Sequence, residues 1–322
     1  MSHRAHSPDS QAQYRGFTAL LLPVIGVLVI TLVLMTGAAL WIGQVTRAEL
    51  IAYKSGTNAT ILYLVDVNRR IAQPIYQDAL AYETWLAWSP NGERLAFVAQ
   101  TATSSEIYVM NIDGTDRINV TNDPARESFP AWLDDQRLIY WTLREAGYRR
   151  VYVVDVITGE AQPYTDRMVP NADSRYSWTH DGLRYALVTW RHGQEEIYVR
   201  DIRESQSIRL TDDPALDYNP VFSPDGQRIA FWSNRENGDM RLYVMNADGS
   251  NVTPVTPPYP SQHEYSWSVT WSADGAKLAF IGFLDGGLGM YTVNANGGAI
   301  TRIITLDSAP GDPPPILAWR PD

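Results

Sequence analysis

The chain has 322 residues, of which 45% are hydrophobic, and carries a formal net charge of −10 at pH 7. This length and composition suffice for the core of one large domain. The excess of acidic side chains argues against a nucleic-acid partner, since phosphate binding requires a basic surface. The absence of cysteine excludes disulfides, thiolate nucleophiles and cysteine-ligated zinc.

The N-terminal segment predicts a membrane anchor. Residues 1–16 form a short polar tail, and residues 17–42 contain no charged side chain. As a helix these 26 residues span about 39 Å, more than the ~30 Å hydrocarbon layer, which predicts a transmembrane helix. The alternative is a cleaved signal peptide, although its apolar core is usually only about 7 to 15 residues. Cleavage would release a secreted or periplasmic protein.

Residues 43–47 are predicted to be a linker, and the repeat region follows at residue 48. Slightly more basic charge precedes the uncharged segment than follows it, which favours a cytoplasmic N-terminus. The sequence therefore predicts a single-pass protein of the cell membrane whose folded domain is extracytoplasmic.

Residues 48–322 consist of six copies of one unit. Each copy has a tyrosine with an apolar residue before it and Asn or Asp three positions after it, and the tyrosines are 44 to 48 residues apart: Tyr63, Tyr108, Tyr152, Tyr198, Tyr243 and Tyr291. An aromatic residue before a turn repeats with the same period: Trp88, Trp132, Trp178, Phe222, Trp271 and Trp319. A period in the mid-forties with four short strands per unit is typical of a β-propeller blade.

The two ends of the repeat region complement each other. Residues 50–55 align with the second strand of a unit at 228–233, whereas residues 317–322 align with the first strand and turn at 220–225. The sequence therefore predicts an all-β, six-bladed β-propeller of four-stranded antiparallel blades. One blade would combine the N- and C-terminal strands, which removes the exposed edges of an open array.

The turn and strand motifs resemble a known family. An SPDG-x-R-I-A-F segment, an I-Y-V-M-N-x-D-G segment and R-L-T at 209–211 resemble the WD-repeat-like blades of TolB-type β-propellers, which prolyl-oligopeptidase-type peptidases also contain. The resemblance covers residues 48–322 and implies a fold rather than an activity. TolB itself has an α/β domain before its propeller, where this chain has its uncharged segment. The sequence contains no G-x-S-x-G motif, which argues against a peptidase.

Acidic residues precede the first strand of successive units and form the candidate binding site: Glu83, Glu127, Asp173, Asp217 and Glu264. In the resembled propellers this segment joins the outer strand of one blade to the inner strand of the next, at the channel mouth. The resemblance thus implies a ring of acids that attracts a cation, a basic side chain or a polypeptide. The structural alternative is that each acid accepts hydrogen bonds from backbone N–H groups of its own loop.

No cofactor, catalytic residue or metal site is predicted. Repeated Asp-Gly pairs indicate tight turns rather than calcium loops, because glycine supplies positive φ and no EF-hand spacing is present. We therefore expect a membrane-anchored, non-enzymatic scaffold of the cell envelope that binds a protein or peptide, with a basic one favoured by the acidic mouth. The alternative is a propeller enzyme, such as a sugar lyase or lactonase, with a metal on its axis.

Overall fold

The computed structural model of the chain describes residues 49–55, 60–78, 85–100, 103–145, 148–170, 174–189, 195–204, 206–258, 268–284, 287–306 and 315–321. The chain divides into two compact units, Met1–Arg47 and Ala48–Asp322. The predicted transmembrane helix and linker lie outside the described residues. Within the described ranges, no helix is both long enough and apolar enough to cross a membrane.

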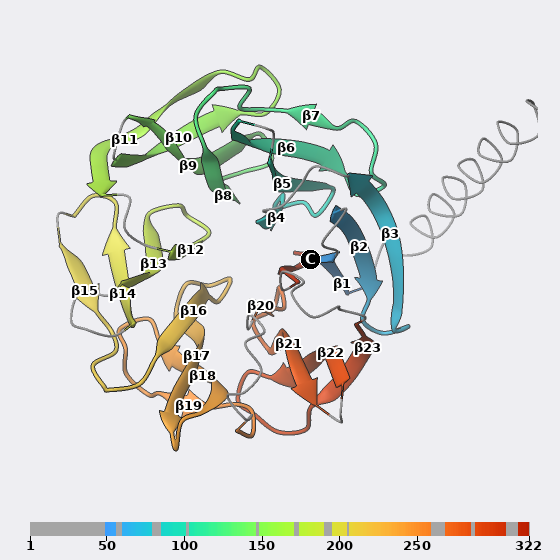
Figure 1. Cartoon of the computed structure of the whole chain (residues 1–322), viewed down its shortest axis with the longest axis vertical. Helices are drawn as coiled ribbons and strands as arrows, with labels where there is room; N and C mark the ends of the chain where they lie inside the picture. Colours follow the sequence, from blue (N-terminus) through green and yellow to red (C-terminus); the bar gives the residue numbers. More distant parts are fainter. Residues whose placement is uncertain are drawn as a thin grey trace, which may run out of the picture. The chain divides into compact units, whose positions relative to one another are not determined.

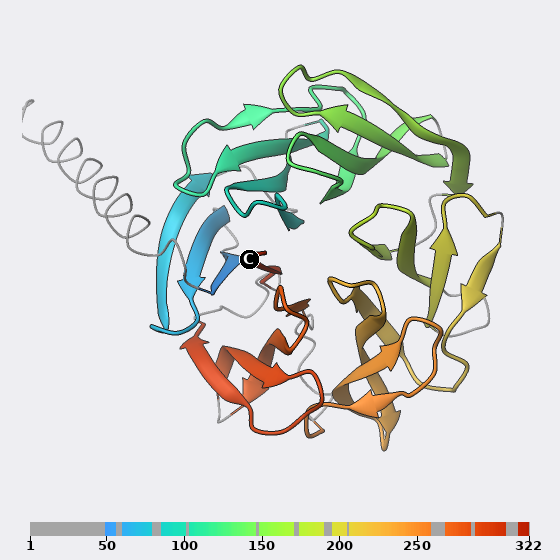
Figure 2. The same ribbon diagram turned by 180° about the vertical axis from the view of Figure 1, so that it is seen from behind.

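The described strands form six antiparallel sheets of four strands each, which confirms the predicted all-β, six-bladed propeller. Figures 1 and 2 show the sheets arranged around a common axis, with the first strand of each blade innermost. We number the blades I to VI in chain order. Because blade I takes its inner strand from the C-terminal end, the innermost strands are β24, β4, β8, β12, β16 and β20.

The bounds of the strands follow blade by blade. Blade I contains β24 (Leu317–Trp319), β1 (Leu50–Ser55), β2 (Thr60–Asp66) and β3 (Ile71–Asp78); blade II contains β4 (Leu86–Trp88), β5 (Arg94–Gln100), β6 (Ser105–Asn111) and β7 (Ile118–Asn119). Blade III contains β8 (Glu127–Trp132), β9 (Arg137–Glu145), β10 (Tyr148–Asp155) and β11 (Ala161–Pro170); blade IV contains β12 (Ser174–Trp178), β13 (Arg184–Thr189), β14 (Glu196–Asp201) and β15 (Ser207–Arg209). Blade V contains β16 (Asp217–Phe222), β17 (Arg228–Glu236), β18 (Asp239–Asn246) and β19 (Thr253–Pro254); blade VI contains β20 (Val269–Trp271), β21 (Lys277–Leu284), β22 (Gly287–Asn294) and β23 (Thr301–Thr305).

The ring closes as the sequence predicts. Strand β24 pairs with β1 in antiparallel register, with Ala52 opposite Ala318 and Tyr53 opposite Leu317. The Arg320 N–H extends the pairing by donating to the carbonyl of Leu50 at 2.8 Å. The inner edge of β1 is therefore covered by the C-terminal strand.

The blades have two different faces. The turns after the first and third strands lie at one face, which we call the turn face, and the loops that join blades lie at the other, the loop face. Turn-face geometry repeats: in blade V, Ser223 Oγ donates to Asp225 Oδ1 at 2.5 Å and accepts the Arg228 N–H at 2.9 Å. Gly226 there has a φ of 65°, which explains the repeated Asp-Gly pairs as turns.

The repeated aromatic residues pack between blades. Trp132 is only 5% exposed, and its cluster joins Ala96 of blade II to Tyr140 of blade III. Its indole N–H donates to the carbonyl of Ala87 in the neighbouring blade at 3.1 Å. These aromatic residues therefore stabilise the ring itself, because wide side chains fill the space between adjacent sheets.

Candidate functional site

Two of the five predicted site acids lie among the described residues. Glu127 begins β8 and Asp217 begins β16, so both stand at the loop face where an inner strand starts. Both side chains are 0% exposed. Glu83, Asp173 and Glu264 lie outside the described residues, so the predicted ring of acids stays a prediction.

The two described acids end the same sequence motif. Residues 121–127 and 211–217 both read T-x-D-P-A-x-acid. The aspartate in the middle of each motif caps its own loop: Asp123 Oδ1 accepts the Ala125 N–H at 2.9 Å, and Asp213 Oδ1 accepts the Ala215 N–H at 2.9 Å. Asp123 and Asp213 thus make the backbone contacts that the structural alternative assigned to acids four positions later.

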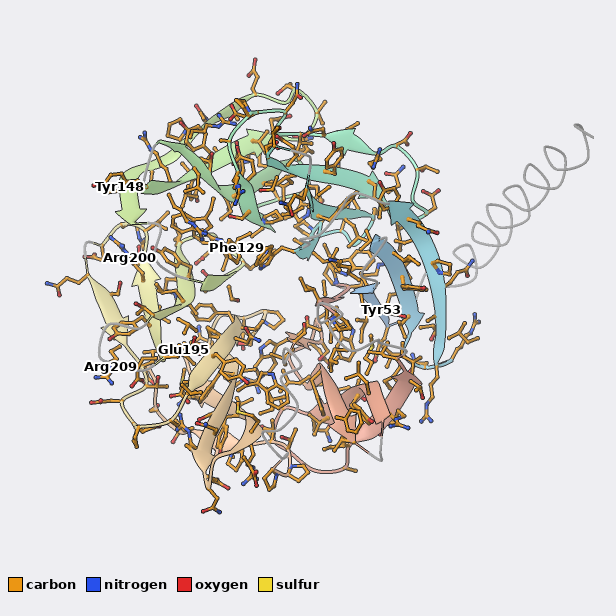
Figure 3. All side chains as sticks on the ribbon, in the orientation of Figure 1. Tyr53, Phe129, Tyr148, Glu195, Arg200 and Arg209 are labelled. Carbon is orange, nitrogen blue, oxygen red and sulfur yellow. The ribbon has the colours of Figure 1, made fainter. Side chains whose placement is uncertain are left out.

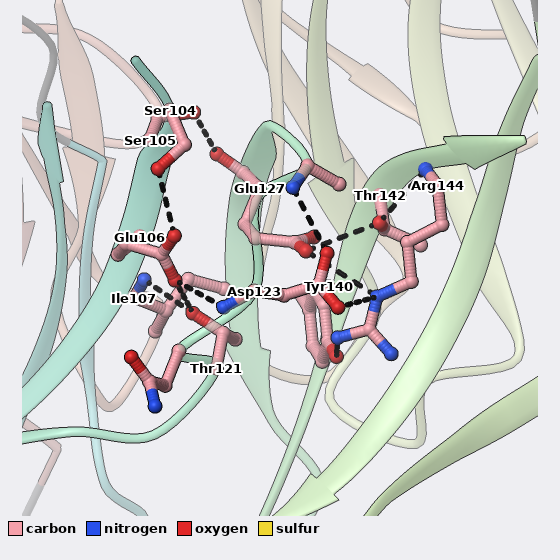
Figure 4. Close-up of polar contacts among 12 residues, drawn as sticks. Ser104, Ser105, Glu106, Ile107, Thr121, Asp123, Glu127, Tyr140, Thr142 and Arg144 are labelled. Atoms are coloured by element: carbon pink, nitrogen blue, oxygen red, sulfur yellow. Dashed lines mark hydrogen bonds and ion pairs between the residues drawn. The ribbon is translucent and has the colours of Figure 1, made fainter. Parts of the chain in front are cut away.

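A buried glutamate of the preceding blade holds each loop in place. Thr121 Oγ1 donates to Glu106 Oε2 at 2.7 Å and accepts the Ile107 N–H at 3.0 Å, and the Asp123 N–H also donates to Glu106 Oε2 (Figure 4). Glu106 is 4% exposed. The loop that carries Asp123 is therefore tied to the third strand of blade II before it enters blade III.

Blade IV repeats this anchor for the next described motif. Thr211 Oγ1 donates to Glu196 Oε2 at 2.7 Å and accepts the Ile197 N–H at 2.9 Å. Arg209 pairs with the other oxygen of Glu196 at 2.6 Å. The same chemistry thus fixes both loops, although each uses residues of a different blade.

An arginine at the end of the second strand completes each group. In blade III, Arg144 Nε lies 3.4 Å from Asp123 Oδ2 and 3.6 Å from Glu127 Oε1. In blade V, Arg235 Nη2 lies 3.2 Å from Asp213 Oδ2 and 2.9 Å from Asp217 Oδ1. We call these two sets, Asp123–Arg144–Glu127 and Asp213–Arg235–Asp217, the acid–arginine–acid groups.

Burial changes the protonation chemistry of the inner acid in each group. Burial raises the pKa of Glu127 to about 7, against the opposing effects of the Thr142 hydrogen bond and the Arg144 charge. Burial also raises the pKa of Asp217. Glu127 Oε2 and Asp217 Oδ2 are buried and have no hydrogen-bond partner among the described residues. Protein hydrogen bonds therefore replace only part of the water that each carboxylate loses on burial, which raises the pKa.

A bulge follows each inner acid by two residues. Phe129 and Asn219 both have a φ of 53°, where the pairing of β8 with β9 and of β16 with β17 shifts register. Asparagine tolerates positive φ, but for a phenylalanine this conformation is strained. Phe129 is held by packing against Trp85, with ring centroids 4.2 Å apart, and Figure 3 shows it on the axial side of its blade.

The groups suit the positioning of a loop better than acid–base catalysis. The inner acids are buried beside a guanidinium and so do not reach solvent. The loop aspartates and the arginines are accessible in part, with side-chain exposures of 28% for Asp123, 23% for Arg144 and 30% for Asp213. Among the described residues, no three His, Asp or Glu side chains are arranged to hold a metal ion.

Sequence reasoning missed the arginines and the loop aspartates. The repeated T-x-D-P-A motif was available as a signal for Asp123 and Asp213. Arg144 and Arg235 lie on the following strand, 17 and 18 positions after the inner acids, and only strand pairing brings them back to the loop face.

Comparisons with known proteins agree with this architecture. Residues 48–178 and 167–305 match a family model described as the TolB beta propeller domain. A TolB homolog of Chlorobium chlorochromatii is 27% identical over 144 residues, which cover 45% of this chain and 32% of that protein. An uncharacterized peptidase of Bacillus subtilis, YuxL, is 27% identical over 156 residues, which cover 47% of this chain and 22% of that protein.

Solved TolB structures show the same fold. TolB from Acinetobacter baumannii has a TM-score of 0.66 at 18% identity, covering 85% of this chain and 67% of that one. A putative TolB from Agrobacterium tumefaciens has a TM-score of 0.61 at 19% identity, covering 85% of this chain and 98% of that one. The chain spans about a third or less of the two curated relatives above, so their activities do not transfer to it. Because the family model covers most of the propeller, the chain belongs to the TolB β-propeller family.

Proposed function

We propose that the chain is a non-enzymatic scaffold of the cell envelope, which binds a protein or peptide at the loop face and is anchored in the membrane by residues 17–42. The observation that carries the proposal is the pair of acid–arginine–acid groups. In two blades they fix a loop between strands by side-chain bonds and leave an aspartate partly exposed. A loop ordered in this way is preorganised, and preorganisation lowers the entropic cost of binding.

The buried acids support a binding role over a catalytic one. A carboxyl group with a pKa raised to about 7 is a candidate general acid or base when a substrate can reach it. Glu127, however, is 0% exposed. Its carboxylate serves as the buried counter-charge of Arg144.

Charge supports a basic partner. Each acid–arginine–acid group contains two carboxyl groups and one guanidinium, so it is negative whenever both acids are ionised. The chain as a whole has a formal charge of −10. Complementary charge increases the rate of encounter and the selectivity for a basic surface. Asp123 and Asp213 are the partly exposed acids of these groups, and such a partner would contact them.

A paired set of variants tests the loop face. Asp123→Asn with Asp213→Asn removes two charges but keeps an oxygen that accepts the loop N–H. The matched control is Asp113→Asn with Asp248→Asn, since these turn-face aspartates also accept a backbone N–H two residues later, at 3.0 and 2.9 Å. After crosslinking in cells and purification from membranes, one partner should be recovered with the wild type and the control and lost with the loop-face variant. Equal recovery from both variants would place binding elsewhere.

Charge reversal at Glu127 or Asp217 is a poor test of binding. Both side chains are buried beside an arginine, so a lysine there would also destabilise the blade.

The anchor is tested separately by fractionation. The full chain should stay with the membrane pellet after alkaline carbonate extraction and keep residues 17–42 in its intact mass. Release of a shorter soluble protein would instead show cleavage of a signal peptide.

A further inference from the structure

At the turn face, an arginine or lysine side chain of one blade bonds to the next blade at five of the six junctions. Arg184 Nη2 of blade IV donates to the Gly226 carbonyl of blade V at 3.1 Å, and Arg228 Nη2 of blade V donates to the Gly275 carbonyl of blade VI at 2.6 Å. The other three bonds run from Arg94 to the Asp135 carbonyl, from Arg320 to the Gly92 carbonyl and from Lys277 to the Glu49 carboxylate. We call all five of these bonds the cross-junction bonds.

Three of these arginines also stack on the next blade. The guanidinium of Arg228 lies 4.7 Å from the ring centroid of Trp271, the residue that ends the inner strand of blade VI. Arg94 over Trp132 and Arg184 over Phe222 repeat the contact at 5.2 and 5.6 Å. A cation on an aromatic face adds to the strength of the hydrogen bond.

The junction between blades III and IV differs. Arg137 occupies the corresponding place in blade III, but the turn before it has one residue fewer and begins with Leu133, where blades II, IV, V and VI have Ser or Thr. Arg137 turns back to Asp134 of its own turn, with Nε at 2.7 Å and Nη2 at 2.6 Å from Oδ2. Leu133 instead packs on blade IV, where its Cδ2 stands 2.3 Å from the position a Cβ on Gly182 would take.

The indole bond is missing at the same junction. The indole N–H groups of Trp88, Trp132 and Trp271 each donate to a carbonyl of the preceding blade at 2.9 to 3.1 Å. Trp178 Nε1, at the III/IV junction, is buried without a hydrogen-bond partner in the described part of the chain. In the part of the chain that the structure describes, two directional contacts that recur at other junctions are therefore lacking here.

Aromatic packing occupies this junction. Trp178 packs on Trp141 and Tyr185, with ring centroids 5.9 and 5.0 Å apart. The Tyr164 hydroxyl stands 3.5 Å from the Cβ position of Gly182, so Tyr164 of blade III also packs against the turn of blade IV.

We propose that the propeller ring opens first at the III/IV junction, rather than at the closure between β24 and β1. Local opening follows the path that breaks the fewest specific contacts, and among the described residues this junction lacks both the cross-junction bond and the indole bond that three other junctions have. Such an opening would separate the acid–arginine–acid group of blade III from that of blade V.

Hydrogen exchange of the full chain in detergent micelles, read by mass spectrometry, tests the proposal. The probes are equivalent turn amides beside three junctions: residues 179–184 at III/IV, 223–228 at IV/V and 272–277 at V/VI. Residues 179–184 should exchange about tenfold faster than the other two segments, because the basic side chain of the preceding blade, Arg137, bonds to its own turn and not to this one. Equal protection of the three segments would overturn the proposal.

Two substitutions provide the internal control. Arg228→Ala removes a cross-junction bond and should speed exchange of residues 272–277 about tenfold. Arg137→Ala removes no bond across its junction and should leave residues 179–184 unchanged. An acceleration of 179–184 by Arg137→Ala as large as the effect of Arg228→Ala would contradict the geometry. If Arg228→Ala does not fold, Arg184→Ala makes the same comparison through residues 223–228.

Discussion

Replacing Glu127 with glutamine should remove a pH-dependent cost from the folded state. The folded protein raises the pKa of Glu127 from 4.5 to about 7, so it holds this proton more tightly than the unfolded chain does. The stabilisation from protonated Glu127 is complete below the unfolded pKa and is lost as the pH rises through about 7. At about 1.4 kcal/mol per pKa unit, the loss amounts to roughly 3 kcal/mol.

The assay is chemical denaturation of the full chain in detergent, followed by tryptophan fluorescence at pH 4 to 8. Glutamine keeps the oxygen that accepts from Thr142 but does not titrate, so the free energy of unfolding of the wild type, relative to Glu127→Gln, should fall across this range. Asp248→Asn serves as a flat control, because hydrogen bonds from Ser250 lower the pKa of Asp248 below 3.8, so its contribution to stability is lost only at a pH below this range. Parallel pH profiles for the wild type and Glu127→Gln would refute the buried-acid reasoning.

Two further predictions concern stability. Gly114 and Gly238 both have a φ of 82°, but a Cβ on Gly114 would stand 2.2 Å from the Ile75 carbonyl oxygen, whereas one on Gly238 meets nothing within 4 Å. Gly114→Ala should therefore lower the free energy of unfolding by about 1 to 3 kcal/mol more than Gly238→Ala does. If chemical denaturation shows the same loss for both variants, the clash with the Ile75 carbonyl does not contribute. Arg144→Met should lower the free energy of unfolding by about 3 kcal/mol at pH 8 and by less at pH 5, where protonated Glu127 needs no counter-charge. A loss that does not depend on pH would contradict the pairing of Arg144 with Glu127.

The fold was predictable because its signals are local and repeated. The tyrosine and tryptophan spacings set the number of blades, and the alignment of residues 50–55 and 317–322 with complementary strands predicted the closure that β24 and β1 make. Each of these inferences needs only neighbours in the sequence. Six repetitions make such a pattern hard to mistake.

The candidate site was predictable only in part. The position of Glu127 at the start of an inner strand follows from the repeat, but its partner Arg144 depends on how β8 pairs with β9. The register of that pairing shifts between Ser128 and Ala131, at a bulge where Phe129 has a positive φ. A phenylalanine in the sequence does not indicate such a backbone conformation. The departure at the III/IV junction was visible in the sequence, as a turn one residue shorter before Arg137.

The pairing of β24 with β1 also fixes an order of events during synthesis. Residues 50–55 leave the ribosome long before their partners at 317–319 are translated. Until those partners are made, the nascent chain carries a strand edge that nothing yet covers, and such an edge can pair with another polypeptide. Chaperone capture of stalled nascent chains should therefore persist until residues 317–319 have been made and can pair with β1.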